Sequence, residues 1–572
     1  MSAMEKSINL ESKNQPNQGD TYPLIIGMIY VFNLILGTGV LTMPNVFSKA
    51  GYVLGLFVMT ALCFISYIHL TFVVEALANA NFMKAIEKSK EKKTNRQESN
   101  SLKNNINNNT SEVQSEDAEV NIQSHIQNDI LPLAQDTSIQ TTTSNSSTTM
   151  ALEQMSSMKD QFAINRKLEL GSMTEMFLPN WFSICFFLSI TMYMVGDLII
   201  YNAMMSKSLR DVMCTFKIDC MLNSTSQQLL KQQCWPNCSI SRMNAYRLIL
   251  LCFILPLIPL TYAGLTKNKF IQIVTIILRW IAFFCMIGIA IKILIRGEGT
   301  GKPVLASFRG FPHMFGVCVY AFMCHHSLPS MLTPIADKTY LYAGMIIDFS
   351  LVLACYFLIT LTGIFAFNQI EDVYTLNFVK NSCKHGHQDA ADIPGLNIFL
   401  PLYPVFTTFS SYTIIALTLI NNLKVVLGYM IDVNNPWLKY TLPLFAIILP
   451  LIVSMFTENV GGAVSIVGAY TGSLIQYVFP TALVYYSRKI IQTQHLKPYV
   501  EQNFHKKNAD TTSSQNETVS IDPNQIDTIQ IYRSLNPFIS YFQHNLWIWS
   551  SAAWWTFSIV VVTINYLVRE KK

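Results

Sequence analysis

The sequence predicts an all-α polytopic membrane protein with about eleven transmembrane helices. Of its 572 residues, 51% are hydrophobic and only 13% are charged. The mean hydropathy of +0.31 is too high for a water-soluble protein of this length. Apolar stretches of about 20 residues, the length that crosses a bilayer, recur along the chain. Two of these stretches are interrupted by glycine, proline and polar residues.

The first interrupted stretch is Tyr22–Pro44, which contains Gly37, Thr38 and Gly39 where a simple membrane anchor has leucine or isoleucine. A break in a membrane helix exposes N–H and C=O groups. In hydrocarbon each unsatisfied group costs several kcal/mol, so broken spans usually line a polar cavity, and transporters use such breaks to hold substrate. A kinked packing helix is the alternative, because small residues also mediate close helix contacts.

The second interrupted stretch is Phe308–Ile335, which is broken around His325, His326 and Ser327. It follows five spans, so a five-plus-five inverted repeat is the economical interpretation, with helices 1 and 6 broken. The paired histidines are either hydrogen-bonded within the helix packing or metal ligands. Since no carboxylate stands at ligand spacing from them, we expect no metal site and no bound cofactor.

Charge in the loops predicts the topology. Six basic residues between Lys84 and Arg96 follow the second span, which places that loop and the N-terminus in the cytosol. The predicted segments are a cytosolic N-terminus (1–21), the first two spans (22–79), a disordered cytosolic loop (80–172), the third span (173–205), an extracellular or lumenal loop (206–244), spans four to ten (245–488), a polar cytosolic loop (489–544), and the last span with the C-terminus (545–572). The first long loop is either a regulatory segment or a neutral low-complexity insertion.

The 206–244 loop combines two features of the extracellular or lumenal side. It holds two glycosylation sequons, at Asn223 and Asn237. It also holds four closely spaced cysteines, namely Cys214, Cys220, Cys234 and Cys238. Zinc binding is the competing interpretation, but the spacing lacks two CxxC pairs. We therefore expect at least one disulfide, without assigning its partners.

Polar groups also stand inside predicted spans. Asp197 lies in the third span and Arg279 in the fifth, and charges at such positions mark either a transport pathway or a structural ion pair. Thr407 and Ser411 belong to a hydroxyl-rich part of the eighth span. Such hydroxyls either bind an alkali cation or donate to carbonyls of their own helix.

Several segments together resemble a known family. Asn33, the Gly37-Thr38-Gly39 sequence, Leu41 and Pro44 resemble the first-helix motif of the amino acid/auxin permease family. The segments 72–81, 193–203 and 320–331 are similar to those of an orphan member of that family. The resemblance implies the inverted-repeat fold of the APC superfamily and amino acid transport, with the substrate held at the two broken helices.

The resemblance also implies roles for particular residues. Gly37, Thr38 and Gly39 match the backbone that receives the substrate carboxylate, and His325 with Ser327 occupies the corresponding break in the sixth span. Asn33 matches an asparagine of sodium-coupled members. Thr407 and Ser411 are our candidates for the sodium ligands of the eighth span. The coupling ion is thus either sodium or a proton.

We expect a cation-coupled secondary transporter of small amino acids, embedded in a lipid bilayer. The alternative is an amino acid sensor with little or no transport. No nucleophile elbow, phosphate loop or metalloprotease signature indicates an enzyme, and no basic stripe indicates a nucleic-acid partner. Plasma membrane and endolysosomal membrane are both open, since Tyr532–Leu535 fits a short tyrosine-based sorting pattern.

We predict that Asn223 and Asn237 carry N-glycans, because the 206–244 loop faces the outside or the lumen. Enzymatic deglycosylation should shift the gel mobility of the wild type but not that of an Asn223→Gln, Asn237→Gln double variant. A mobility shift that persists in the double variant would show that another loop faces that side.

Overall fold

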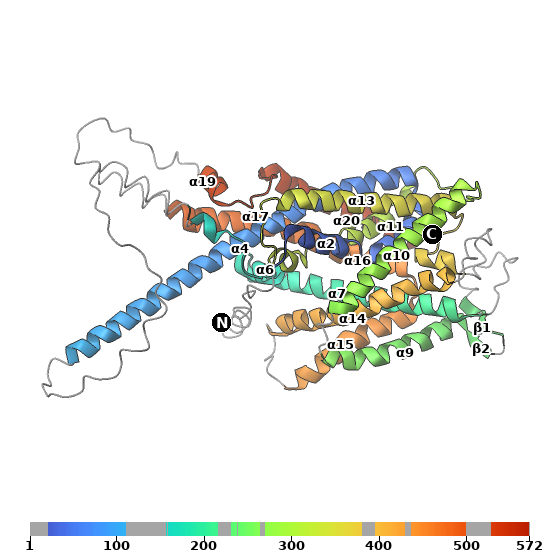
Figure 1. Cartoon of the computed structure of the whole chain (residues 1–572), viewed down its shortest axis with the longest axis horizontal. Helices are drawn as coiled ribbons and strands as arrows, with labels where there is room; N and C mark the ends of the chain where they lie inside the picture. Colours follow the sequence, from blue (N-terminus) through green and yellow to red (C-terminus); the bar gives the residue numbers. More distant parts are fainter. Residues whose placement is uncertain are drawn as a thin grey trace. The chain divides into compact units, whose positions relative to one another are not determined.

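The computed structural model describes residues 21–109, 156, 158–215, 230–236, 238–263, 269–379, 395–428, 436–498 and 528–570. These residues are almost entirely helical (Figure 1). They belong to two compact units. The larger lies within Met1–Leu77, Ile164–Thr493 and Ile539–Lys572, and the smaller within Ala78–Ala163 and Gln494–Phe538.

Eight helices in the described part of the chain are long and apolar enough to cross a membrane. Seven of them lie within single helices, namely α4 (Tyr52–Asn109), α7 (Asn180–Met213), α9 (Arg242–Ala263), α10 (Lys269–Ile295), α13 (Leu341–Ala366), α14 (Leu396–Gly428) and α20 (Asn545–Glu570). The eighth is a continuous run that begins with α16 (Val460–Val467) and passes through η5 (Gly468–Gly472), η6 (Leu474–Val478), α17 (Phe479–Ile490) and η7 (Ile491–Leu496). Helix α15 (Pro436–Phe456) contains a shorter apolar stretch. The prediction of a helical polytopic membrane protein is confirmed.

Both predicted breaks are present. The first span is divided into α2 (Leu24–Ile35), the 3-10 turn η1 (Thr38–Leu41) and α3 (Met43–Ala50). The second is divided into η2 (Phe308–Gly310), α11 (Phe311–Ala321) and α12 (Leu328–Leu332).

The two broken spans lie side by side and run in opposite directions. At one end the N–H of Tyr22 donates to the carbonyl of Pro334 over 3.1 Å, and at the other the N–H of Ser307 donates to that of Ala50 over 2.7 Å. Between these ends η1 lies against α11. The start of each span is therefore tied to the end of the other, and the two breaks meet.

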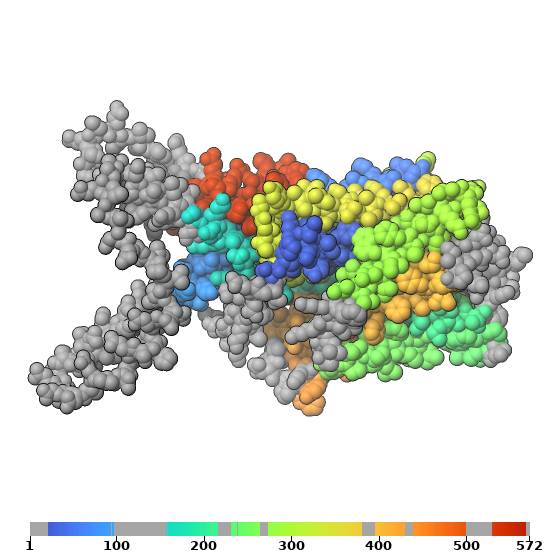
Figure 2. Space-filling model, in the orientation of Figure 1, coloured from blue at the N-terminus to red at the C-terminus, as the bar shows by residue number. Residues whose placement is uncertain are grey.

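Helix α7 lies at the centre of the larger unit, where it packs against α14, α15, α9 and α16. Helix α13 covers α2 and α3, and α10 packs against α13 and α14. In Figure 2 the outer face of α2, in dark blue, is visible between α13 in yellow and α10 in green. Ile25 and Ile29 of α2 are 71% and 52% exposed, as expected for side chains that meet lipid.

Two glycines bring α11 against the run that begins with α16. A Cβ added to Gly316 would lie 2.0 Å from the Ser465 carbonyl oxygen, and one added to Gly468 would lie 2.0 Å from the Gly316 carbonyl oxygen. No side chain fits between the two backbones here, so glycine is required at both positions. The π-helical turns η5 and η6 follow directly.

The sequence predicts disorder over residues 80–172, but the structure is helical at both ends of this segment. Helix α4 continues from the second span to Asn109, and α6 (Leu170–Phe177) precedes the third span. Lysine and glutamate, good helix formers, are frequent between residues 84 and 93, and the Lys84–Glu87 pair at 2.8 Å adds to the helix. The polar loop over 489–544 likewise contains helix α19 (Thr528–Leu535).

The sorting pattern in α19 is not accessible. Within the smaller unit Tyr532 and Leu535 are 1% and 2% exposed, and the Tyr532 hydroxyl donates to Asn79 Oδ1 over 2.9 Å. A linear motif must be exposed to be bound, so the pattern does not serve as an address in this conformation.

The 206–244 loop contains a disulfide between Cys214 and Cys234, as the sequence predicted for at least one pair. It lies beside the antiparallel pair β1 (Gln233–Trp235) and β2 (Cys238–Ser241), and the Cys238 thiol is free. Cys220, Asn223 and Asn237 lie outside the described residues.

A buried ion pair joins α4 to α17. Both carboxylate oxygens of Glu75 accept from Arg488, through Nε and Nη2, at 2.7 Å each. The N–H of Ser540 donates to the same carboxylate over 2.9 Å. Glu75 is fully buried, so its charge depends on these three donors.

We predict that Glu75→Ala destabilises the protein by about 3–5 kcal/mol, because it removes the carboxylate from a buried, charged hydrogen-bond set. Glu87→Ala is the matched control on the same helix, since Glu87 pairs with Lys84 at the surface, where such pairs contribute at most about 1 kcal/mol. Thermal unfolding of purified protein in detergent measures both. If the two variants lowered the thermal midpoint equally, the buried Glu75 pair would contribute no more to stability than the surface pair.

Candidate functional site

The first break is partly open to solvent in an otherwise buried stretch. Gly37 and Thr38 are partly exposed, whereas Leu36 and Gly39 are buried. A Cβ added to Gly37 would meet no atom closer than 3.9 Å. There is therefore free space beside the backbone at the point where the helix is interrupted.

The backbone on the far side of the break presents N–H groups. Residues from Thr38 onward form η1 and then α3, with Thr42 in helical conformation between them. The first N–H groups of a helical run have no partner within it, and the positive end of its dipole favours an anion. A carboxylate placed beside Gly37 would meet these groups.

Five side chains surround this position and are here called the central polar cluster. They come from η1, α7, α11 and the second break, and they are Thr38, Tyr193, Asp197, Tyr320 and His326. The Thr38 and Tyr320 hydroxyl oxygens are 3.3 Å apart. The ring of Tyr193 lies 6.1 Å from that of Tyr320 and 5.6 Å from that of His326, between centroids.

Asp197 is the acidic residue of this cluster. It is 6% exposed and lies within hydrogen-bonding reach of Tyr320, but its Oδ1 atom has no hydrogen-bond partner. A buried carboxylate oxygen without a donor is costly, and a cationic or ammonium group would satisfy it. Asp197 was singled out from the sequence as an intramembrane charge, and the structure places it beside the break.

The histidines of the second break have different surroundings. His325 is buried with Nε2 at 3.1 Å from the Ser66 carbonyl oxygen of α4, whereas His326 faces Tyr193. Ser327 is partly exposed just before α12. Of the two histidines, His326 rather than the predicted His325 belongs to the central polar cluster. Within the described residues, no three His, Cys, Asp or Glu side chains are grouped as metal ligands.

The predicted ion ligands make mostly helix-internal contacts. Asn33 Nδ2 donates to the Ile29 carbonyl over 2.8 Å, while its buried Oδ1 has no partner. Thr407 donates to the Tyr403 and Pro404 carbonyls, each over 3.2 Å. Ser411 stands one turn further along α14, and the structure does not bring it to the break.

Arg279 contacts the break itself. Its Nη1 atom donates to the Asn33 and Leu36 carbonyls over 2.7 and 2.8 Å. A structural ion pair was the alternative to a transport pathway for these two charges, and among the described residues Arg279 is not paired with Asp197. Tyr356 of α13 also contacts the first break, and its hydroxyl is 2.9 Å from both the Ile35 and the Ala321 carbonyl oxygens.

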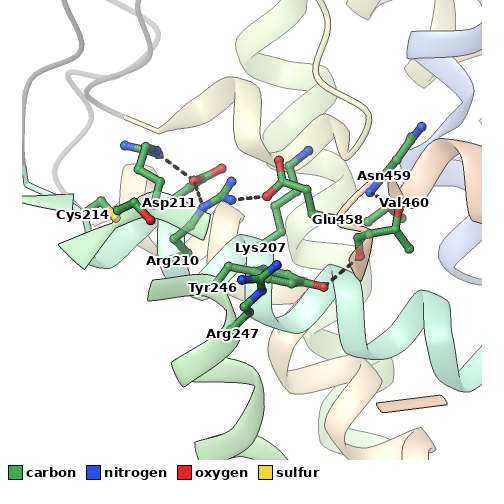
Figure 3. A network of polar contacts seen from close by, with 12 residues as sticks. Lys207, Arg210, Asp211, Cys214, Tyr246, Arg247, Glu458, Asn459 and Val460 are labelled. Carbon is green, nitrogen blue, oxygen red and sulfur yellow. Dashed lines mark hydrogen bonds and ion pairs between the residues drawn. The ribbon is translucent and has the colours of Figure 1, made fainter. Parts of the chain in front are cut away.

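A second charged group lies at the C-terminal end of α7, near the 206–244 loop that we expect on the outer side (Figure 3). Arg210 of α7 contacts Asp211 over 2.8 Å and also pairs with Glu458, which precedes α16. The remaining pairs are Arg242 with Asp211 at 2.7 Å, and Lys207 with Asp372. Three cations and three carboxylates thus neutralise each other across α7, α9 and two loops. We call this set the outer ion-pair network.

Comparison with known proteins decides the family. A family model described as "Transmembrane amino acid transporter protein" matches residues 148–505, which is more than half of the chain.

The chain belongs to this family. The resemblance seen in the sequence is thereby confirmed. Similar proteins include the Transmembrane protein 104 homolog of Drosophila melanogaster, 38% identical over 482 residues, with 82% of this chain and 89% of the relative covered. Transmembrane protein 104 of Homo sapiens is 36% identical, with 83% and 89% covered, and that of Gallus gallus is 34% identical, with 97% and 98% covered.

Sequence reasoning missed four residues at or near the breaks, namely Tyr193, Tyr320, His326 and Tyr356. Tyr193, Tyr320 and His326 lie in segments that the sequence singled out, but only the packing shows that Tyr320 reaches Asp197 and that His326 faces Tyr193. Tyr356 gave no signal, because a single tyrosine in an apolar helix is unremarkable in sequence. Its contacts with Ile35 and Ala321 depend on the folded arrangement.

We predict different outcomes for alanine at the two glycines of the first break. A Cβ at Gly39 would lie 3.0 Å from Ala321 Cα, so Gly39→Ala must push η1 from α11 and lower the thermal midpoint. Gly37→Ala meets only open space at φ −89°, and its midpoint should equal or slightly exceed that of the wild type. Equal losses in both variants would mean that the space beside Gly37 does not exist.

Proposed function

We propose that the protein is a secondary transporter of small amino acids, which binds its substrate where the two broken helices meet and works by alternating access. The observation that carries this proposal is the partly exposed, open backbone at Gly37 and Thr38, which the Tyr320 hydroxyl links to the buried Asp197 carboxylate. A zwitterion fits this pair of opposite electrostatic environments. Its carboxylate would accept from the N–H groups that begin η1, and its ammonium group would pair with Asp197.

Small substrates fit this arrangement best. Tyr193, Tyr320 and His326 surround the position with rings, which leaves little room for a large side chain. Hydroxyl groups of Thr38 and Tyr320 are available to orient the ligand.

We further propose eleven crossings in a five-plus-five inverted repeat. The eight long helices, α15 and the two broken spans of the described residues together supply eleven segments for these crossings. The opposite directions of the two broken spans support an inverted relation between the halves. Transport is proposed to be coupled to a cation, either sodium at Asn33, Thr407 and Ser411 or a proton at Asp197, in the plasma membrane or an endolysosomal membrane.

Alternating access requires that the route from the substrate site to one side of the membrane be closed while the route to the other side is open. The outer ion-pair network joins α7 and α9 to the loops before α14 and α16, and in this conformation it holds the outer helix ends together. We propose that these pairs separate when the site opens to the outside.

The proposal is tested by uptake of labelled amino acids into proteoliposomes that contain the purified full chain, with sodium and proton gradients imposed separately. We predict uptake by the wild type and its loss in Asp197→Asn. Thr38→Ala should weaken apparent affinity about fivefold, because one neutral hydrogen bond contributes about 1 kcal/mol.

Gly37→Val, which adds side-chain atoms to the open space, should lose uptake while keeping its thermal midpoint. Saturable binding of an amino acid without uptake would favour the sensor function instead. Absence of both binding and uptake across the labelled mixture would refute the amino acid site.

A further inference from the structure

Three of the carbonyl groups at the first break, those of Asn33, Ile35 and Leu36, already accept from side chains of the chain itself. A broken helix leaves its last carbonyls without intrahelical partners, and in transporters such carbonyls coordinate a coupling cation. Here Arg279 takes the Asn33 and Leu36 carbonyls, and Tyr356 takes that of Ile35. At the second break Tyr356 also contacts the Ala321 carbonyl, and Gln476 Nε2 lies 3.5 Å from that of Phe322.

The group at the first break is moreover a permanent cation. Arginine keeps its charge at any physiological pH. The guanidinium stands at the C-terminal end of α2, where the helix dipole is negative and favours positive charge. Arg279 therefore satisfies both the hydrogen bonding and the electrostatics that would otherwise attract a metal cation.

Two of the three sodium ligands suggested by the sequence, Asn33 and Thr407, are linked to this arginine. The Asn33 carbonyl accepts from Arg279, and Tyr403, whose carbonyl accepts from Thr407, lies within hydrogen-bonding reach of the guanidinium. A sodium ion among these oxygens would lie about 4 Å from a positive charge. At an effective dielectric of about 20, that repulsion would weaken binding roughly a thousandfold.

We propose that Arg279 takes the place of a coupling metal cation at the first break, so that no sodium ion binds there. The inference rests on the proposed function only in treating the break as the transport site. It removes sodium at Asn33, Thr407 and Ser411 from the two coupling schemes above.

The first test measures the thermal midpoint of the purified full chain in sodium chloride and in N-methyl-D-glucamine chloride at equal ionic strength. We expect the two midpoints to be the same at every salt concentration. A saturable rise with sodium that disappears in Asn33→Ala would overturn the proposal. This readout needs no amino acid, so it is independent of whether uptake is found.

The second test removes the charge. Arg279→Ala should lower the midpoint, and millimolar methylguanidinium or sodium should raise it again, because the vacated carbonyls can then bind a small cation. Lys292→Ala, which removes an exposed cation of the same helix, should show no such rescue. A folded Arg279→Ala protein that responds to neither cation would overturn the proposal.

Arg279→Lys keeps the test decisive if the alanine variant does not fold. Lysine retains the positive charge at the carbonyls, so its midpoint should remain independent of sodium. A sodium-dependent rise in Arg279→Lys would show that the position binds the metal alongside a fixed charge, contrary to the proposal.

Discussion

A helix that is interrupted inside a membrane must find hydrogen-bond partners for its loose backbone groups, and this constraint organises the present structure. Arg279 and Tyr356 reach the first break from α10 and α13, and Tyr356 also reaches the second. The packing of these two helices is thus tied to the breaks. Three carbonyls of the first break are satisfied by the protein, whereas the Asp197 Oδ1 atom has no partner and remains for a ligand.

Sequence alone predicted the membrane class, both breaks, the charged residues in the spans and one disulfide, because each of these follows from local composition. It could not predict which side chains meet. Tyr356 lies 321 positions from Ile35, and Arg279 lies 246 from Asn33, so only the folded arrangement reveals these contacts. Adjacent residues of a helical turn face different neighbours, which is why His326, and not His325, joins the central polar cluster.

In the polar loops the sequence predicts less structure than is present. Their low apolar content indicates disorder over 80–172, yet α4 continues to Asn109. Helix propensity does not require a hydrophobic face when a helix extends directly from a stable membrane span, since the costly first turn is already formed. In the smaller unit a few buried residues, Tyr532 among them, supply packing that the average composition of these loops conceals.

The glycine contact between α11 and the run that begins with α16 bears on how the molecule can move. With the Gly316 and Gly468 backbones directly opposed, neither helix can rotate or tilt against the other without a collision. Over this stretch they must travel as a rigid body. A rearrangement at the second break would then have to be taken up by residues 322–327, because α11 is held against the run that begins with α16.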